Sequence, residues 1–534
     1  MWRRGCFSWE YKGKHKDLRA ALRQLVTYSL DLESPPYLVV SDMERIEVHS
    51  NWTNTVTRTW KFGFDDLRVG ANLDVLREVF EGSEKLKPQQ TPQELTAKVA
   101  ARFGQLGRKL QERGEPPRVV AHFLNRLVFC MFAEEARLLP EGLFTRLVKA
   151  TMKKPAQAQS QLSELFAKMA ARDSFFGAES IRWFNGGLFD DNTALLLDPD
   201  DLKLIYATAG EHDWSQIDPA IFGNLFEQAL KATRERPALG AHYTDRDKIL
   251  KIVEPVIVRP LTKEWGTALE AIKLCLADMA AAEEKRRAVL EEGAAALKQK
   301  GAEAKSGEKR RRDEIAATLK RKDAALGAAR DKLENYLARL AAFRVLDPAC
   351  GSGNFLYVAL HALKDLELRA LVEAERLGLP APAPRIGLAA VKGIEIEAYA
   401  AELARVTLWI GDLQWQMKNG YTAYSEPVLS SLDQIECRDA LLNPDGSEAE
   451  WPEADVIIGN PPFLGGKKMR DGLGDKTVER LFATYDGRVP AEADFVCYWV
   501  EKAWLAIKMG HTERAGLVTT NSISGAFGRV VLVF

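Results

Sequence analysis

The sequence predicts an α/β protein whose C-terminal part is a doubly wound parallel sheet, preceded by a helical region and a small α/β segment. After residue 343, short apolar or β-branched runs alternate with helical stretches, which is typical of parallel strands joined by crossover helices. Two runs end in polar turns, Asp347-Pro348-Ala349-Cys350-Gly351-Ser352-Gly353 and Asn460-Pro461-Pro462-Phe463. Because ligands bind beyond the carboxyl ends of such strands, both turns are candidate binding loops.

The composition is that of a globular chain with several domains. Hydrophobic residues make up 46% of the 534 residues and charged residues 28%, as in ordinary globular proteins. The formal net charge is −1, so any contact with nucleic acid requires local basic patches. The six cysteines lack metal-like or disulfide-like spacing, and we find neither a signal peptide nor an apolar run of about 18 residues. We therefore predict a cytoplasmic protein with no membrane contact.

Changes in pattern divide the chain into three predicted domains, residues 1–75, 76–232 and 233–534. The first is a small α/β domain with a strand near Gly5–Tyr11, a helix over His15–Leu32 and a hairpin over residues 37–49. The second is mostly helical, with apolar residues at helical spacing in Val119–Ala133. The third contains the parallel sheet.

A charged insertion over residues 262–342 interrupts the third domain. No proline occurs in residues 262–347, and residues 281–340 hold 27 charged residues, 16 basic and 11 acidic, with many alanines. This composition predicts a long solvated helix or a helical hairpin. One interpretation is a spacer within a single domain; the other, based on the local excess of basic residues, is an arm that contacts the DNA backbone.

The first three strands of the predicted sheet end in residues suited to a nucleotide-like cofactor. Gly351 and Gly353 allow a sharp turn into a helix whose N–H groups can meet polar ligand atoms. Glu395, at the end of the second strand, can accept both hydroxyls of a ribose. It follows Asp347 by 48 residues, whereas a dinucleotide fold has about 20, so a nicotinamide cofactor fits poorly. Asp439, after the third strand, can accept from an exocyclic amino group.

The turn Asn460-Pro461-Pro462-Phe463 is suited to a planar amino group. The amino nitrogen of a nucleobase is a poor nucleophile because its lone pair is delocalised into the ring. The side-chain oxygen of Asn460 and the carbonyl of Pro461 can accept its two hydrogens and favour sp³ geometry. The prolines fix the turn and remove competing N–H donors, and Phe463 offers a face for an extruded base.

These two turns together resemble the class I amino-group DNA methyltransferases that use S-adenosylmethionine, and Leu239-Gly240-Ala241-His242-Tyr243-Thr244 resembles the motif that precedes the first strand in their gamma arrangement. The resemblance implies that Tyr243 and Thr244 lie near the cofactor carboxylate, and that Asp347, Gly351 and Gly353 surround its methionine part. Glu395 would then hold the ribose, Ile396 would pack on the adenine and Asp439 would bind the adenine amino group. The segment Asn521-Ser522-Ile523 resembles the following family motif.

The resemblance also implies methylation of adenine N6 in double-stranded DNA, because position 460 is an asparagine rather than the serine of the cytosine-N4 version of this motif. The catalytic residues implied are Asn460, Pro461, Pro462 and Phe463. Such an enzyme belongs to a restriction–modification or phage-defence system. Methyltransferases acting on RNA or on a glutamine amide in protein carry a similar turn, and they remain an alternative substrate class.

The N-terminal region resembles part of a PD-(D/E)xK nuclease. Glu10 and Lys12 form a Glu-x-Lys on the first strand, and Gln24 and Tyr28 lie four residues apart on the following helix. In that family such residues hold Mg²⁺ and position water, so Glu10 and Lys12 are candidate metal-site residues. A nuclease remnant, a helical spacer and a gamma-order methyltransferase together resemble the MmeI-like fused restriction–modification proteins.

Two departures from the family pattern concern the ends of the chain. No Asp or Glu precedes Glu10, and the chain stops at Phe534 soon after the fifth predicted strand. We therefore expect a chain truncated at both ends, without the target-recognition domain that follows in the family. A non-catalytic fragment that binds cofactor or DNA is the resulting alternative function, and a nuclease acting alone is disfavoured by the missing acid.

Overall fold

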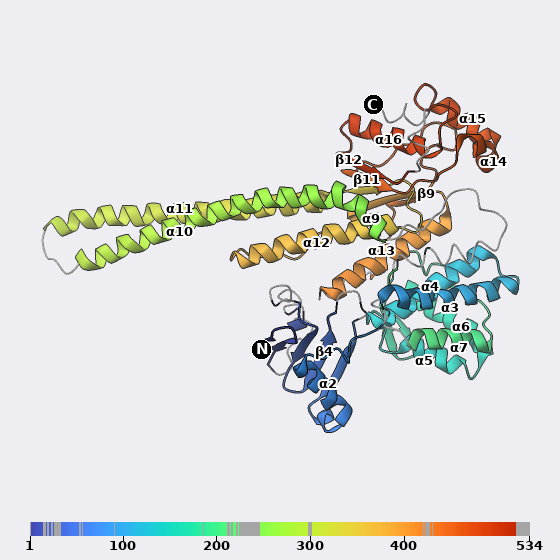
Figure 1. Ribbon diagram of the computed structural model, residues 1–534, viewed down its shortest axis with the longest axis horizontal. Coiled ribbons are helices and arrows are strands. Elements are labelled where there is room, and N and C mark those ends of the chain that lie inside the picture. The colour runs from blue at the N-terminus through green and yellow to red at the C-terminus, as the bar shows by residue number, and fades with distance from the viewer. Residues whose placement is uncertain are drawn as a thin grey trace.

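The computed structural model describes residues 2–13, 18, 21–22, 25, 32, 34–52, 55, 57–89, 91–184, 186–210, 214, 217–219, 223, 246–296, 302–419, 421, 428–429 and 431–519. These residues form a small N-terminal sheet, a helical spacer and a C-terminal parallel sheet from which a long helical hairpin projects (Figure 1). Among the described residues, no helix is long and apolar enough to cross a membrane.

The N-terminal domain is a five-stranded sheet in the order β1-β2-β3-β4-β5. Its elements are β1 Trp2–Arg3, β2 Phe7–Tyr11, β3 Tyr37–Ser41, β4 Arg45–Ser50, β5 Thr59–Gly63, the 3₁₀ helix η1 Asp65–Arg68 and α2 Gly70–Glu81. Strands β2 and β3 are parallel and the other neighbours are antiparallel. Most of the helix predicted over His15–Leu32, including Gln24 and Tyr28, lies outside the described residues.

The spacer packs around a group of aromatic side chains that include Phe129, Phe166 and Phe189. Its elements are α3 Pro92–Glu112, α4 Pro117–Glu135, α5 Leu143–Thr151, η2 Pro155–Gln157, α6 Ala158–Ala170, β6 Ser174–Phe176, β7 Glu179–Ile181 and α7 Pro199–Gly210. The short β6–β7 ribbon was not predicted from the sequence, which indicates mainly helices in this region. The buried Arg126 is tolerated because it donates to the carbonyls of Asp191 and Thr193.

The C-terminal sheet is entirely parallel, with strand order β10-β9-β8-β11-β12. Its strands are β8 Val345–Asp347, β9 Val391–Glu395, β10 Ile435–Cys437, β11 Val456–Gly459 and β12 Arg514–Leu517. The chain therefore winds from β8 through β9 to β10, and then crosses back to place β11 on the other side of β8. The sequence prediction of a doubly wound sheet is confirmed, and the strand order reverses between β8 and β11.

Helices cover both faces of this sheet, which is why its strands are apolar at successive positions. In β11, Val456 and Ile458 join the core on the face of α12 Asn354–Arg376 and α13 Ala398–Lys418, whereas Ile457 joins the core on the opposite face. The remaining elements around the sheet are α9 Arg246–Val253, the π-helical turn η4 Glu254–Val258, η5 Leu388–Ala390, η6 Gly466–Lys468, α14 Met469–Leu473, α15 Asp475–Thr484 and α16 Val496–Lys508.

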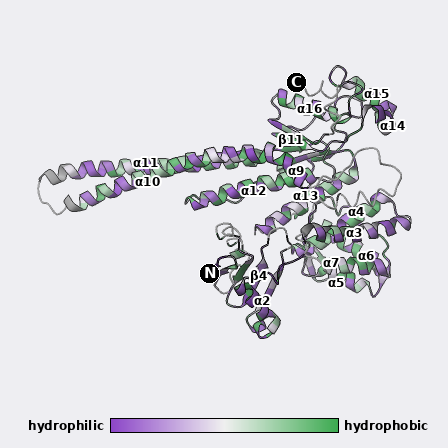
Figure 2. Cartoon of the chain, in the orientation of Figure 1, coloured by the Kyte–Doolittle hydropathy of each residue, from purple (hydrophilic) through white to green (hydrophobic). Residues whose placement is uncertain are grey.

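The charged insertion forms an antiparallel helical hairpin of α10 Arg259–Ala296 and α11 Ala302–Ala342 (Figure 1). Charged residues occur along both helices (Figure 2). At its base, Arg339 pairs with Asp455, before β11, and with Glu513, before β12. Since these acids precede parallel strands, the hairpin is anchored at the amino ends of the strands.

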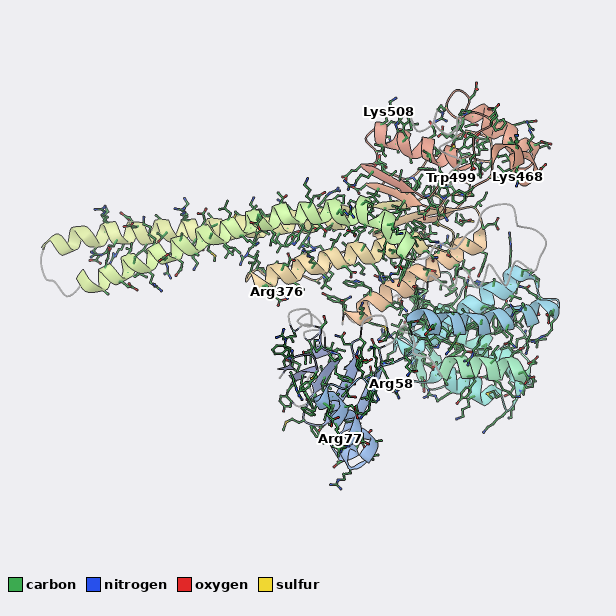
Figure 3. All side chains as sticks on the ribbon, in the orientation of Figure 1. Arg58, Arg77, Arg376, Lys468, Trp499 and Lys508 are labelled. Carbon is green, nitrogen blue, oxygen red and sulfur yellow. The ribbon has the colours of Figure 1, made fainter. Side chains whose placement is uncertain are left out.

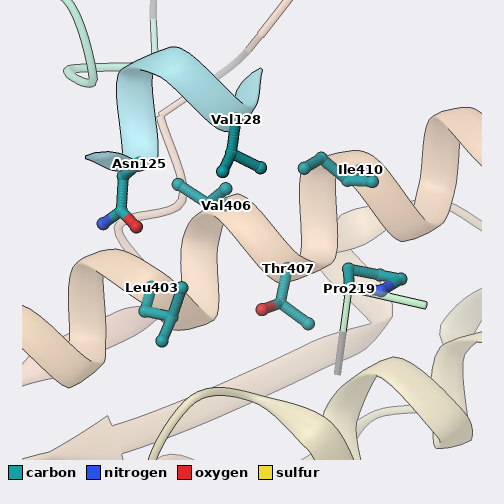
Figure 4. A pocket seen from close by; sticks show the side chains of 7 residues that line it. All are labelled: Asn125, Val128, Pro219, Leu403, Val406, Thr407 and Ile410. Carbon is teal, nitrogen blue, oxygen red and sulfur yellow. The ribbon is translucent and has the colours of Figure 1, made fainter. Parts of the chain in front are cut away.

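The spacer and the sheet domain share a continuous core through α4 and α13. Glu402 on α13 accepts from Asn125 at 3.0 Å and lies 2.7 Å from Nδ1 of His122, both on α4. A narrow pocket between these helices is mostly apolar (Figure 4). It is lined by Asn125, Val128, Pro219, Leu403, Val406, Thr407 and Ile410. The helical spacer therefore supports the helix that follows β9.

Close packing of α13 on α12 gives a stability prediction for Gly411. A Cβ at this position would collide with the buried ring of Tyr357. We expect Gly411→Ala to lower the free energy of unfolding by about 1–3 kcal/mol, because the ring has no room to move. Urea denaturation followed by tryptophan fluorescence measures this change.

The matched control is Gly327→Ala in α11, where a Cβ would meet no atom within 4 Å. Alanine is the better helix former there by up to about 1 kcal/mol, so stability should hold or rise. Equal effects of the two substitutions would contradict the packing between α12 and α13.

Candidate active site

The two predicted binding loops lie side by side at the carboxyl ends of neighbouring strands. Asp347 ends β8 and Gly459 ends β11, and a Cβ added to Gly459 would lie 2.5 Å from Oδ1 of Asp347. Asn460 follows Gly459 directly. The reversal of strand order between β8 and β11 thus brings Asp347 and Asn460 to one place, although 113 residues separate them in the sequence.

Asp347 is a buried carboxyl group, with 1% of its surface exposed. Its Oδ1 accepts from the N–H of Ala349 at 3.0 Å, while Oδ2 accepts no hydrogen bond from the described residues. Burial raises the pKa of Asp347 to about 8, and the nearby charge of Glu395 contributes. A buried oxygen of this kind is suited to a ligand that brings a hydrogen-bond donor or a positive charge.

The glycine loop after Asp347 is shaped by its backbone and held by Glu395. Gly351 and Gly353 have φ values of 53° and 83°, which favour glycine, and Gly353 precedes the first residue of α12. Glu395 Oε2 accepts from the N–H of Gly351 at 2.9 Å, and Oε1 accepts from the N–H of Glu397 at 2.8 Å. Since each carboxylate oxygen can accept two hydrogen bonds, Glu395 keeps capacity for two hydroxyls.

Ile396 and Asp439 follow the carboxyl ends of the neighbouring strands β9 and β10. The side chain of Ile396 is 57% exposed, which is unusual for an isoleucine that follows a buried strand. Oδ1 of Asp439 accepts from the N–H groups of Leu441 and Leu442 and so fixes the turn after β10. Arg438 N donates to the carbonyl of Glu395 at 3.0 Å, which joins this turn to the end of β9.

The turn around Asn460 is braced by the segment before α16. Oδ1 of Asp494 accepts from the N–H groups of Leu464 at 3.1 Å and Val496 at 3.3 Å, and Phe495 N donates to the Leu464 carbonyl at 2.9 Å. Phe463 is partly buried against the core beneath α16. Leu464, the residue directly after the turn, is therefore held at both its N–H and its carbonyl.

Helix α16 also reaches the other two loops. Trp499 Nε1 donates to the Pro348 carbonyl at 3.2 Å, and Lys502 Nζ donates to the Ala449 carbonyl at 2.7 Å in the loop after β10 (Figure 3 labels Trp499). The roles of Asp494, Trp499 and Lys502 were not predicted from the sequence. The available signal was an aspartate directly before an apolar helix, a typical helix start.

The donors and acceptors present fit the expected cofactor. The buried oxygen of Asp347 that accepts no hydrogen bond suits the cationic amino acid part. The spare acceptor capacity of Glu395 suits a ribose, and the exposed apolar side chain of Ile396 suits a planar base. Gly223 lies directly against Ser352 of the glycine loop. The predicted residues Tyr243 and Thr244, and the segment 521–523, lie outside the described residues, so their roles stay predictions.

The predicted metal residues lie in the N-terminal sheet. Lys12 Nζ donates to Oε1 of Glu10 at 2.8 Å. Among the residues that the structure describes, no group of three or more His, Cys, Asp or Glu side chains could hold a metal ion. The assignment of Glu10 and Lys12 to a Mg²⁺ site therefore stays a prediction.

Two family models match this chain. The model described as the MmeI DNA-methyltransferase domain matches residues 322–532, and the model described as the MmeI helicase spacer domain matches residues 118–189. DNA methyltransferase A of Bacillus subtilis strain 168 is 25% identical over 96% of this chain and 52% of its own length. The type II methyltransferase M.BstVI of Geobacillus stearothermophilus is 29% identical over 27% of this chain and 24% of its own length.

A similar fold occurs in the solved structure of the type IIL restriction–modification enzyme MmeI in complex with DNA. The match has a TM-score of 0.58 and 24% sequence identity, and it covers 82% of this chain and 52% of that chain. This chain thus spans about half the length of DNA methyltransferase A and of the MmeI chain.

The raised pKa of Asp347 gives a prediction about stability and pH. The pKa of Asp347 in the folded protein lies above its ordinary value of 3.8, which applies to the unfolded chain. The folded protein therefore binds the proton more tightly than the unfolded chain does. Proton binding by Asp347 therefore adds to the free energy of unfolding. This stabilisation is fully present at low pH and is lost as the pH rises through about 8. We expect the ligand-free protein to lose stability over that range.

Asp347→Asn removes this titration and should flatten the pH dependence. Urea unfolding of both proteins at about pH 6 and about pH 9 measures the difference. The same pH dependence in both would show that Asp347 does not titrate in the folded protein as its burial implies.

Proposed function

Because this chain is MmeI-like in its spacer and methyltransferase regions, we propose that it transfers a methyl group from S-adenosylmethionine to N6 of adenine in double-stranded DNA. The single observation that carries the proposal is the close approach of Gly459, the residue directly before Asn460, to Asp347 at the reversal point of the parallel sheet. We also propose that this activity serves a restriction–modification or phage-defence system, and the likeness to a type IIL restriction–modification enzyme supports the first of these.

The site residues divide into a cofactor side and a base side. On the cofactor side, Asp347, Gly351 and Gly353 would hold the methionine part, Glu395 the ribose, Ile396 the adenine ring and Asp439 its amino group. Tyr243 and Thr244 would complete this side near the carboxylate. When bound, S-adenosylmethionine supplies an electrophilic methyl group on a sulfonium.

On the base side, Asn460 and the carbonyl of Pro461 would accept the two hydrogens of the target amino group. These contacts localise the lone pair on the nitrogen and favour its attack on the methyl carbon. As the N–C bond forms the C–S bond breaks, the thioether S-adenosylhomocysteine is the leaving group, and the nitrogen loses one proton to solvent, so no covalent intermediate with the protein is needed. Pro462 keeps the turn rigid without adding an N–H donor. Phe463 would stack on a base extruded from the duplex.

The bracing of this turn supports the same assignment. Asp494 and Phe495 hold Leu464, and α16 fixes the loops after β8 and β10. Acceptors fixed before the substrate arrives need no reorganisation during the reaction, which is a major source of catalytic power. Asp494 is thus a positioning residue.

The proposal predicts different effects of Asn460→Ala on catalysis and on cofactor binding. Transfer of labelled methyl groups to unmethylated genomic DNA should fall by at least about 100-fold, the scale for loss of one aligned catalytic hydrogen bond. The dissociation constant for S-adenosylmethionine, measured by calorimetry, should change little, because the cofactor residues are on other strands.

An equal loss of cofactor affinity and of transfer in Asn460→Ala would contradict the role given to Asn460. Parallel assays with RNA and with protein extract distinguish the alternative substrate classes. Transfer to either, with none to DNA, would replace DNA as the substrate. Cofactor binding by the wild type without any transfer would support a non-catalytic fragment.

A further inference from the structure

The segment that follows Phe463 presents two adjacent lysines at the protein surface. Lys467 and Lys468 end the 3₁₀ helix η6, and both are exposed. Neither forms an ion pair with any residue in the described parts of the chain. Figure 3 labels Lys468 close to α14. Two unneutralised positive charges therefore lie four and five positions after Phe463, the last residue of the proposed catalytic turn.

The backbone of this lysine segment is tightly held. A Cβ at Gly466 would lie 2.5 Å from the carbonyl oxygen of Glu492, so only glycine fits there. Leu464 on one side and the fully buried Met469 on the other anchor the segment in the core. The lysines thus have long side chains on a fixed backbone, which suits repeated contact with one ligand.

Their position relative to the target base is also limited. Lys467 lies four positions after Phe463, and an extended chain over four positions spans at most about 14 Å. Phosphates along one DNA strand are about 3.4 Å apart along the helix axis. A base stacked on Phe463 therefore places Lys467 and Lys468 within a few nucleotides of it.

Nearby acidic side chains do not neutralise these lysines: Asp471 on α14 makes no ion pair with either of them within the described structure. Asp475 and Glu479 pair with Arg470, at 2.9 and 3.6 Å. The carboxylate of Glu492 is exposed and makes no ion pair with either lysine within the described structure. In a chain whose formal net charge is −1, this places a local positive surface beside the candidate site.

The helical hairpin is the other basic feature, but its position suits DNA contact at the reaction centre less well. Its base is tied by Arg339 to Asp455 and Glu513 at the amino ends of the strands. Lys467 and Lys468 instead follow the carboxyl end of β11, the edge that holds Asn460.

We propose that Lys467 and Lys468 bind backbone phosphates of the DNA strand that carries the target base, within a few nucleotides of it. This inference rests on the proposed function. Phosphate contacts position a duplex without reading its sequence. The two lysines would hold the strand while the base leaves the stack.

The test compares DNA binding by the wild type and by the double variant Lys467→Ala/Lys468→Ala. The probe is a fluorescent duplex cut from DNA that the wild type methylates, and anisotropy is measured across a series of salt concentrations. Each phosphate contact contributes about 0.9 to the slope of log K against log salt, so the slope should fall by about 1.8. Affinity for S-adenosylmethionine should not change.

The matched control is Lys153→Ala/Lys154→Ala, an adjacent pair of exposed lysines on the spacer between α5 and η2. Its slope should equal that of the wild type. The charge-conserving double variant Lys467→Arg/Lys468→Arg should keep the wild-type slope as well, which excludes an effect of altered folding.

The outcomes separate this inference from the proposed function. If the wild type methylates and binds DNA but the Lys467/Lys468 double variant keeps the full slope, the lysine contact is wrong and the proposed function stands. An equal loss in the Lys153/Lys154 control would also overturn it. If the wild type neither binds nor methylates DNA, both proposals fail.

Discussion

The close contact between Asp347 and Gly459 is the constraint on which the candidate site depends. These residues end adjacent parallel strands, and a Cβ at position 459 would lie 2.5 Å from the Asp347 carboxylate. Only glycine lets the two strand ends approach so closely. The approach brings the loop suited to a cofactor against the turn suited to an amino group, which is the arrangement that a direct methyl transfer requires.

Contacts on both faces of the sheet hold this arrangement in place. On one face they come from α16 and the segment before it, and on the other face they come from the spacer. Asp494, Trp499 and Lys502 contact the three loops that follow β11, β8 and β10. On the other face, Glu402 of α13 binds His122 and Asn125 of the spacer. The spacer therefore belongs to the same packed unit as α13, the helix that follows Glu395.

The sequence was sufficient to predict the residues at the strand ends but not the residues that brace them. Asp347, Glu395 and Asn460 could be identified because each follows a short apolar run, and local pattern determines where a strand ends. Asp494 and Trp499 act on loops 30 and 151 residues away. Such partners depend on how the helices pack across the sheet, and one sequence holds no local signal for that. The composition of residues 262–342 predicts a helical hairpin, but it does not predict that Arg339 anchors the hairpin to the residues before two strands.

The most direct test of this account is the identity of the methylated nucleoside. Unmethylated genomic DNA incubated with the protein and labelled S-adenosylmethionine is digested to nucleosides, which are separated and counted. The proposed roles of Asn460 and Phe463 predict that the label appears in N6-methyladenine. Label in a methylated cytosine would contradict the assignment of Asn460 and Phe463 to an adenine amino group, and the absence of label from DNA would contradict the proposed activity of this chain.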